Sequence, residues 1–174
     1  RGLGDGYKRQ IDPHLASDED DDVIQLYTSG TTGHPNGVQL TNKNFYAATD
    51  NTIGVIPFPS GSKAMICMPV YHVAGTNFGI WGLLLGCKNL IIPEVDPGLI
   101  LDLVEKEKIE LPLWVPAVIL FLLQHPNAEK TDFSSLKVVV YGASPIAEDT
   151  VVNAIKLMNC GFYQVYGLTE TSGA

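Results

Sequence analysis

From residue 23 onward, short apolar runs alternate with longer segments that mix apolar and polar residues at helical spacing. Short runs rich in β-branched side chains are typical of buried strands, and longer segments that open near Pro, Asn or Thr are typical of helices. The pattern predicts strands at 23–27, 37–40, 64–68, 89–92, 111–115, 136–141 and 162–166, and helices at 42–53, 77–85, 97–106, 116–124 and 144–158. This alternation predicts an α/β fold with a largely parallel sheet and helices on both faces.

Two features of this pattern place candidate binding segments. The short distance between the runs 23–27 and 37–40 predicts an antiparallel hairpin that carries the loop at its tip. In parallel sheets, ligands gather beyond the carboxyl ends of the strands, which here are the segments after Tyr141 and Tyr166. Thr41 or Asn42 is placed to cap the helix after the hairpin, and Ser144 is placed to cap the helix after residue 141.

The loop between the first two runs reads Tyr-Thr-Ser-Gly-Thr-Thr-Gly-His-Pro-Asn-Gly over residues 27–37. Glycines let the backbone approach a ligand closely, and the hydroxyls with the loop N–H groups suit phosphate oxygens, although Gly and Thr are also common in plain hairpin turns. The Gly-Lys-Ser/Thr ending of a Walker A loop is absent. The candidate phosphate-binding residues are Thr28, Ser29, Gly30, Thr31, Thr32, Gly33 and Asn36.

The string TSGTTGHPNG resembles the phosphate loop of the adenylate-forming, or AMP-binding, superfamily. Three further segments resemble that family's motifs: PVYHVAG at 69–75, YGASP at 141–145 and YGLTET at 166–171. The resemblance is strongest to fatty-acid CoA ligases. It implies that the chain is part of a large N-terminal domain, with residues 1–22 a flexible acidic lead-in, 23–174 a partial AMP-binding domain and the C-terminal domain absent. We therefore expect a fragment of a longer protein.

The resemblance also implies roles for single residues. The loop would hold the β- and γ-phosphates of ATP, Tyr166 would stack on adenine, Thr169 and Glu170 would act in catalysis, and Glu170 would bind Mg²⁺. The small residues Gly142, Ala143 and Ser144 would leave room for adenine and an acyl group, and His72 would border the acyl pocket. Each also has a plain structural interpretation: a lone His is usually a structural residue, a Glu at this place often starts a helix, and 142–144 can be a turn.

At Asn36 the sequence departs from the family, whose members usually have Lys there. Replacing a charge-assisted contact by a neutral one weakens phosphate binding by roughly 1 to 2 kcal/mol. The lysine that relatives use in adenylation and their ribose-binding Asp both lie beyond this chain's motifs, so we expect the 174 residues alone to be inactive.

Net charge, cysteine content and the length of the apolar stretches limit the partners and the compartment that we expect. The net charge is -8, and the acidic run at 18–22 would repel nucleic acid, so no nucleic-acid partner is expected. Cys67, Cys87 and Cys160 are isolated among apolar residues and predict core thiols in a reducing cytoplasm. The longest apolar stretch, 115–123, falls short of the roughly 20 residues of a membrane span, so no transmembrane segment is predicted.

These observations favour an ATP- and Mg²⁺-dependent ligase that converts a carboxylic acid to an acyl-adenylate and then to acyl-CoA. CoA follows from the resemblance only. The apolar run 77–85 and the YGASP segment favour a fatty acid as the substrate. Two alternatives stay open: an amino-acid-activating or luciferase-like adenylation enzyme, and a non-catalytic nucleotide-binding module.

Overall fold

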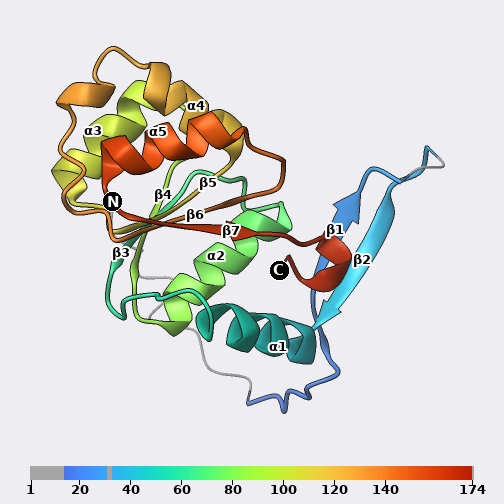
Figure 1. The fold of residues 1–174 in the computed structure, drawn as a ribbon. Helices are drawn as coiled ribbons and strands as arrows, with labels where there is room; N and C mark the ends of the chain where they lie inside the picture. The colour runs from blue at the N-terminus through green and yellow to red at the C-terminus, as the bar shows by residue number, and fades with distance from the viewer. Residues whose placement is uncertain (1–13, 31–32, 174) are drawn as a thin grey trace.

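The chain folds into a two-stranded hairpin beside a five-stranded sheet (Figure 1). The structure is a computed structural model that describes residues 14–30 and 33–173. The hairpin is formed by β1 (Asp22–Thr28) and β2 (Asn36–Thr41). The five-stranded sheet has the order β4-β3-β5-β6-β7, and all its strands are parallel. Its members are β3 (Lys63–Ile66), β4 (Lys88–Ile91), β5 (Leu111–Trp114), β6 (Val138–Gly142) and β7 (Gly161–Val165).

Helices cover both faces of this sheet, as the sequence predicted. On one face lie α3 (Pro97–Glu107), α4 (Pro116–Gln124) and α5 (Glu148–Met158), and on the other lies α2 (Val73–Leu84) (Figure 1). Because successive strand residues point to opposite faces, Val139 packs under α3 to α5 while Val138 and Val140 pack under α2. Burial on both faces explains why the strands read as continuous apolar runs.

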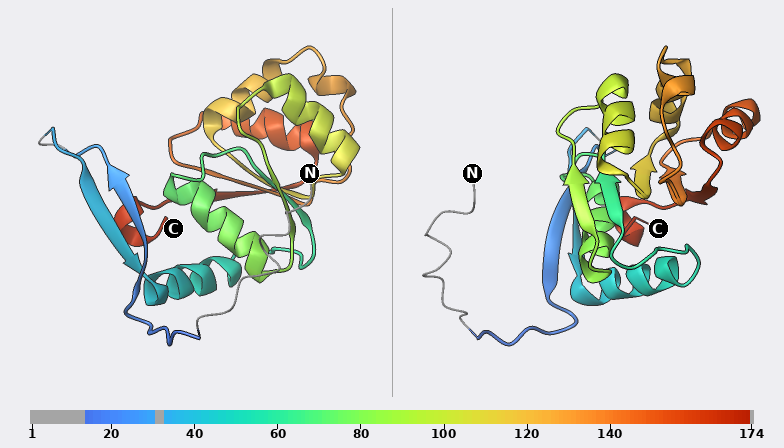
Figure 2. Two further views of the ribbon diagram at one scale, coloured as in Figure 1. Left: turned by 180° about the vertical axis from the view of Figure 1, so that it is seen from behind. Right: turned by 90° about the vertical axis from the view of Figure 1, so that its left-hand side faces the viewer.

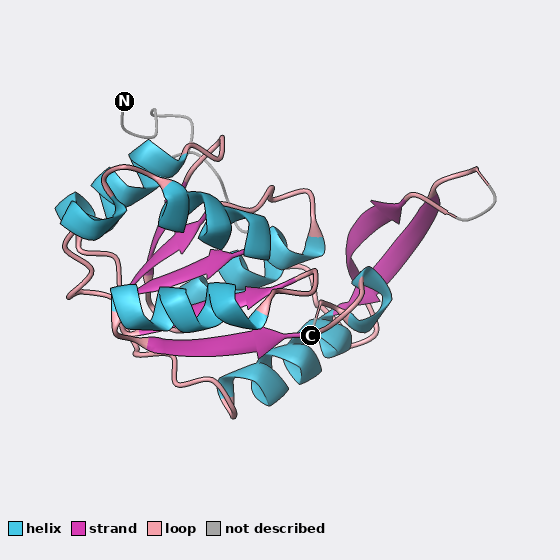
Figure 3. Cartoon of the chain, turned by 45° about the horizontal axis from the view of Figure 1, so that its top comes forward, coloured by secondary structure: helices cyan, strands magenta, loops and turns pink. Residues whose placement is uncertain are grey.

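The hairpin stands to one side of the sheet (Figures 2 and 3). A small core of Leu26, Leu40, Phe45 and Val73 joins it to α1 (Asn42–Ile53) and α2. Its strands pair antiparallel with Thr28 opposite Asn36, which confirms the predicted hairpin with the loop at its tip. The acidic segment before β1 contacts the start of α1, where Lys43 Nζ lies 2.8 Å from Glu19 Oε1.

Two predicted helix starts are corrected by the structure. The helix expected at residue 77 begins at Val73, because His72 caps it. The helix expected after Ser144 begins at Glu148, with Ala147 as its N-cap and no side-chain cap. Ile146 packs against the core in the segment between β6 and the helix. Ser144 is therefore no helix cap.

The cysteines are free thiols, as predicted. Cys67 and Cys87 are buried and Cys160 is half-buried. Burial raises the pKa of the Cys67 thiol to about 12 and that of Cys160 to about 11. A thiol with such a pKa stays protonated near neutral pH and is a poor nucleophile, which agrees with a packing role.

Candidate active site

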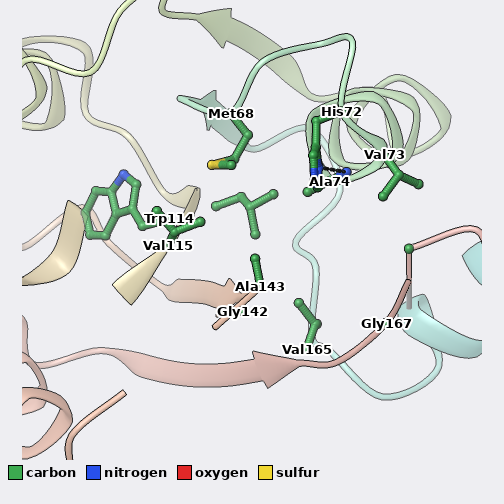
Figure 4. A pocket seen from close by; sticks show the side chains of 12 residues that line it. Met68, His72, Val73, Ala74, Trp114, Val115, Gly142, Ala143, Val165 and Gly167 are labelled. Atoms are coloured by element: carbon green, nitrogen blue, oxygen red, sulfur yellow. Dashed lines mark hydrogen bonds between the residues drawn. The ribbon is translucent and has the colours of Figure 1, made fainter. Parts of the chain in front are cut away.

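A pocket opens at the carboxyl edge of the parallel sheet, where β3, β5, β6 and β7 all end (Figure 4). We call it the central pocket; its volume is about 50 Å³. The start of α2 forms one wall and the ends of β5, β6 and β7 form the rest. The lining residues are Met68, His72, Val73, Ala74, Leu113, Trp114, Val115, Gly142, Ala143, Val165, Gly167 and Gly173. The sequence predicted that this edge binds ligands, and three of its predicted site residues, His72, Gly142 and Ala143, line the pocket.

His72 has the structural function weighed from the sequence, and it also lies at the central pocket, where the predicted functional one would require it. Its Nδ1 accepts a hydrogen bond from the Ala74 N–H at 3.1 Å, so the ring caps α2. An accepting Nδ1 places the proton of a neutral ring on Nε2. The same side chain is exposed and lines the central pocket (Figure 4). The cap fixes the ring at the pocket mouth.

The end of β6 is shaped by small residues. A Cβ at Gly142 would collide with the carbonyl oxygen of Val165 on β7, so no larger residue fits without moving a strand. Ala143 follows with φ of +70°, a left-handed conformation that non-glycine residues seldom adopt. Such strain persists where the surrounding structure imposes it, often at binding sites. The bend turns the chain over the pocket and keeps side-chain bulk out of it.

A second opening lies beside the central pocket, and we call it the Tyr166 hollow. Its volume is about 330 Å³, and its lining residues are Ala143, Ser144, Pro145, Gln164, Val165, Tyr166, Gly167 and Leu168. Tyr166 is 86% exposed, which is unusual for a large aromatic side chain and leaves the ring face open for stacking. The predicted adenine-binding residues Tyr166, Ala143 and Ser144 thus lie together.

Thr169 and Glu170 lie just beyond, in the short 3-10 helix η3 (Thr169–Thr171). Glu170 is exposed and lines a third opening, the Glu170 hollow, of about 230 Å³ between η3 and α1. Asn44 and Asn51 of α1 line the opposite wall. Within residues 14–30 and 33–173, no cluster of three or more His, Cys, Asp or Glu side chains is placed to hold a metal ion. The exposed Glu170 carboxylate is an oxygen ligand of the kind that Mg²⁺ takes when phosphates and water supply the rest.

The strands of the hairpin extend away from the five-stranded sheet (Figure 1). Gly30 and Gly33 have φ of +54° and +87°, and a Cβ at Gly30 would collide with the His34 carbonyl oxygen. The Asn36 amide nitrogen would lie 3.3 Å from such a Cβ, so the Asn36 side chain lies against the loop. Thr31 and Thr32 fall outside the described residues. Thr28, Ser29, Gly33 and Asn36 line none of the three openings described above.

The structure also identifies site residues that the sequence did not. Met68, Leu113 and Gly173 line the central pocket, and Asn77 of α2 donates through Nδ2 to the Ser172 carbonyl, which ties α2 to the segment after η3. Asn77 was placed only as the start of a buried helix. A lone amide inside an apolar helix was a signal for a buried polar contact.

Residues 4–174 match the model of the AMP-binding enzyme family. The chain belongs to this family. It is 32% identical to the fatty acid–[acyl-carrier-protein] ligase ScoC of Streptomyces coeruleorubidus, over 97% of this chain and 35% of ScoC. It is 35% identical to 4-coumarate–CoA ligase 1 of Arabidopsis thaliana, over 86% of this chain and 28% of that protein. The chain thus spans about a third of the length of these relatives.

A solved structure agrees with this assignment. The inhibitor-bound N-terminal domain of FACL13 from Mycobacterium tuberculosis superimposes with a TM-score of 0.87 at 27% identity, over 93% of this chain and 40% of that one. The predicted α/β fold and the predicted family are therefore confirmed. Both of these relatives are acid ligases, but the acids for which they are named differ. In the part of the chain that is described, no helix is long and apolar enough to cross a bilayer.

Proposed function

We propose that the protein containing this chain activates a carboxylic acid with ATP. The carboxylate attacks the α-phosphorus, which forms an acyl-adenylate and releases pyrophosphate, and a thiol then displaces AMP to give a thioester. The observation that carries this proposal is the contact between two openings. The central pocket and the Tyr166 hollow share Ala143, Val165 and Gly167, so an acid in the first would present its carboxylate to a nucleotide in the second.

Positioning and charge neutralisation are the main tasks in such a transfer. Tyr166 would stack on adenine, and the Thr169 hydroxyl would contact the α-phosphate. Glu170 would hold Mg²⁺, which supplies positive charge against the phosphate oxygens. The hairpin loop would hold the outer phosphates through the hydroxyls and N–H groups around Gly30, with Asn36 as a neutral donor.

The acid and the thiol belong to the proposal as well. The apolar lining of the central pocket supports a fatty acyl group, in agreement with the sequence, and the fatty-acid ligase among the relatives supports the same choice. CoA is proposed as the thiol because 4-coumarate–CoA ligase is named for it, although ScoC is named for a carrier protein. We propose action in the cytoplasm, where reduced core thiols are stable.

One alternative has support from a particular residue. Asn36 removes the cation expected beside the phosphates, which favours a non-catalytic nucleotide-binding module. Carboxylate-dependent exchange of pyrophosphate into ATP by the full-length protein separates the two: exchange with a panel of acids supports the ligase, and AMP or ATP binding without exchange supports the module.

The 174-residue chain itself serves as a second arm of this test. We expect no acyl-AMP from the chain with ATP, Mg²⁺ and octanoic acid, because the resemblance places an adenylation lysine and a ribose-binding carboxylate outside it. Formation of acyl-AMP by the chain would show that these groups are dispensable and would overturn this assignment of roles.

A further inference from the structure

The first turns of α2 contact both the central pocket and the segment that follows η3. Val73 and Ala74 line the pocket directly after the His72 cap. One turn further along the helix, Asn77 is 2% exposed, and its Nδ2 donates a hydrogen bond to the carbonyl oxygen of Ser172. Residues four apart lie on the same face of a helix, so Val73 and Asn77 share the face that meets this segment.

The turn around η3 has a single buried residue. Within residues 167–173 every residue is exposed or half-buried except Ser172, which is 3% exposed. The three N–H groups of residues 171–173 donate to carbonyls of the same turn. Among the described residues, the hydrogen bond from Asn77 is the one that joins 167–173 to another element. Asn77 therefore anchors η3 to the body of the protein.

Gly173 makes room for this contact. A Cβ at Gly173 would lie 2.7 Å from Asn77 Nδ2 and 3.2 Å from Val73 Cγ2. Its φ of +97° is also one that favours glycine. η3 lies beside β2 of the hairpin as well (Figure 1), but no hydrogen bond joins these two elements in the described part of the chain. The directional link of η3 is thus to α2, the helix that forms a wall of the central pocket.

From this geometry we propose that Asn77 is a positioning residue for the nucleotide. Through the Ser172 carbonyl it holds η3, and with it Thr169 and Glu170, in place relative to an acid in the central pocket. The proposal rests on the proposed function, in which Thr169 contacts the α-phosphate and Glu170 binds Mg²⁺. Groups that act on a reacting centre must be held to within roughly 0.5 Å, and hydrogen bonds behind the site supply that order. Asn77 needs no contact with ATP for this role.

Asn77→Leu and Asn77→Ala in the full-length protein remove the donor. Leucine keeps a branched side chain in the space and excludes water, whereas alanine leaves room for a water that can restore part of the bond. In pyrophosphate exchange with octanoic acid, we expect the KM for ATP to rise about fivefold to tenfold in Asn77→Leu and less in Asn77→Ala. We expect the KM for octanoic acid to rise less than the KM for ATP. A rise for the acid that equals or exceeds the rise for ATP overturns the proposal and assigns Asn77 to the acid pocket.

Asn89 provides the matched control. On β4, its Nδ2 donates to the carbonyl oxygen of Gly79 in α2 at 2.9 Å, and the Oδ1 atoms of both asparagines are buried without a hydrogen-bond partner among the described residues. Asn89 lines none of the three openings. The same two substitutions at Asn89 therefore remove the same kind of bond from the same helix and leave the turn around η3 intact.

This control distinguishes positioning from stability. A loss of stability alone reduces the amount of folded enzyme, which lowers the apparent kcat and leaves the KM unchanged. We expect the KM for ATP to stay at the wild-type value in Asn89→Leu. An equal rise in Asn77→Leu and Asn89→Leu would show a general effect of loosening α2 and would overturn the proposal.

Amide hydrogen–deuterium exchange separates failure of this inference from failure of the proposed function, because it needs no turnover. Peptides of the full-length protein that cover 167–173 report on the turn, whose N–H groups are bonded internally. We expect deuterium uptake there to become roughly tenfold faster in Asn77→Leu and to stay unchanged in Asn89→Leu. If this happens and no acid supports pyrophosphate exchange, the anchor stands and the ligase activity fails. Unchanged uptake in Asn77→Leu, or faster uptake with an unchanged KM for ATP in an active enzyme, overturns the positioning role.

Discussion

The parallel sheet and the hairpin place candidate site residues by different means. In the sheet, strands buried on both faces bring residues as distant as Ala74 and Val165 to one edge, and backbone packing defines the openings there. The hairpin rests on a core of four buried residues and leaves Ser29 and residues 33–36 exposed. A rigid edge can select a substrate by shape, whereas an exposed loop can contribute hydroxyls, N–H groups and charge.

This contrast makes the two regions respond differently to substitution. At the sheet edge, added atoms meet backbone that cannot move independently. In the paired strands of the hairpin, as at Gly37, an added Cβ meets the end of the flexible Gln25 side chain. The predictions below begin with the sheet edge, where the largest effect is expected.

Gly142→Ala should destabilise the fold by about 2 to 4 kcal/mol, because its Cβ collides with the Val165 backbone carbonyl and must separate β6 from β7. Urea unfolding followed by circular dichroism measures the change. Gly37→Ala in β2 is the control: its Cβ meets the end of the flexible Gln25 side chain, and we expect a loss under about 1 kcal/mol. Similar losses in the two variants would remove the distinction between the regions.

Glu170→Gln should lower carboxylate-dependent pyrophosphate exchange at least tenfold, about 1.4 kcal/mol in the barrier, because a neutral amide binds Mg²⁺ poorly. Exchange is measured in the full-length protein across a range of Mg²⁺ concentrations. Glu148→Gln, at the exposed start of α5 and away from the Glu170 hollow, serves as the charge-matched control. An unchanged rate at limiting Mg²⁺ would make Glu170 a structural residue.

Asn36→Lys should lower the KM for ATP a few-fold, about 1 kcal/mol, by adding a charge-assisted contact to the outer phosphates. The gain should shrink as salt rises, because exposed charges are screened over about 10 Å at 0.1 M. Gln39→Lys on the same strand adds the same charge farther from the loop and should have less effect. Equal KM values for wild type and Asn36→Lys at low salt would show that Asn36 does not face the nucleotide.

Cys67 should resist alkylation by iodoacetamide at pH 8, since its folded-state pKa of about 12 leaves almost no thiolate. The unfolded thiol titrates near its ordinary pKa, so the unfolded state loses its proton first as pH rises. Cys67 therefore lowers stability progressively above that pKa and up to the folded-state pKa. Peptide mass mapping after labelling checks the first point. Labelling of native Cys67 as fast as in urea would show that the β3 end opens readily.

The sequence predicted the alternation of strands and helices. Strands that are buried on both faces appear in the sequence as continuous apolar runs, which can be recognised locally. From the motif at 166–171 it predicted Tyr166 and Glu170 as site residues, and the structure places them at two different openings. It did not predict that α2 begins at Val73, since the cap there is an imidazole, which is not among the residues usual at helix starts. Nor did it predict the role of Asn77, whose partner lies 95 residues away.

By itself the sequence determined the family, the fold class and the order of the motifs, because these depend on residue type and spacing along the chain. Only the tertiary structure decided that the central pocket and the Tyr166 hollow adjoin and that Gly142 must stay small. These are relations between segments far apart in the chain. They exist once strand pairing and helix packing fix the distances, and no local pattern carries them.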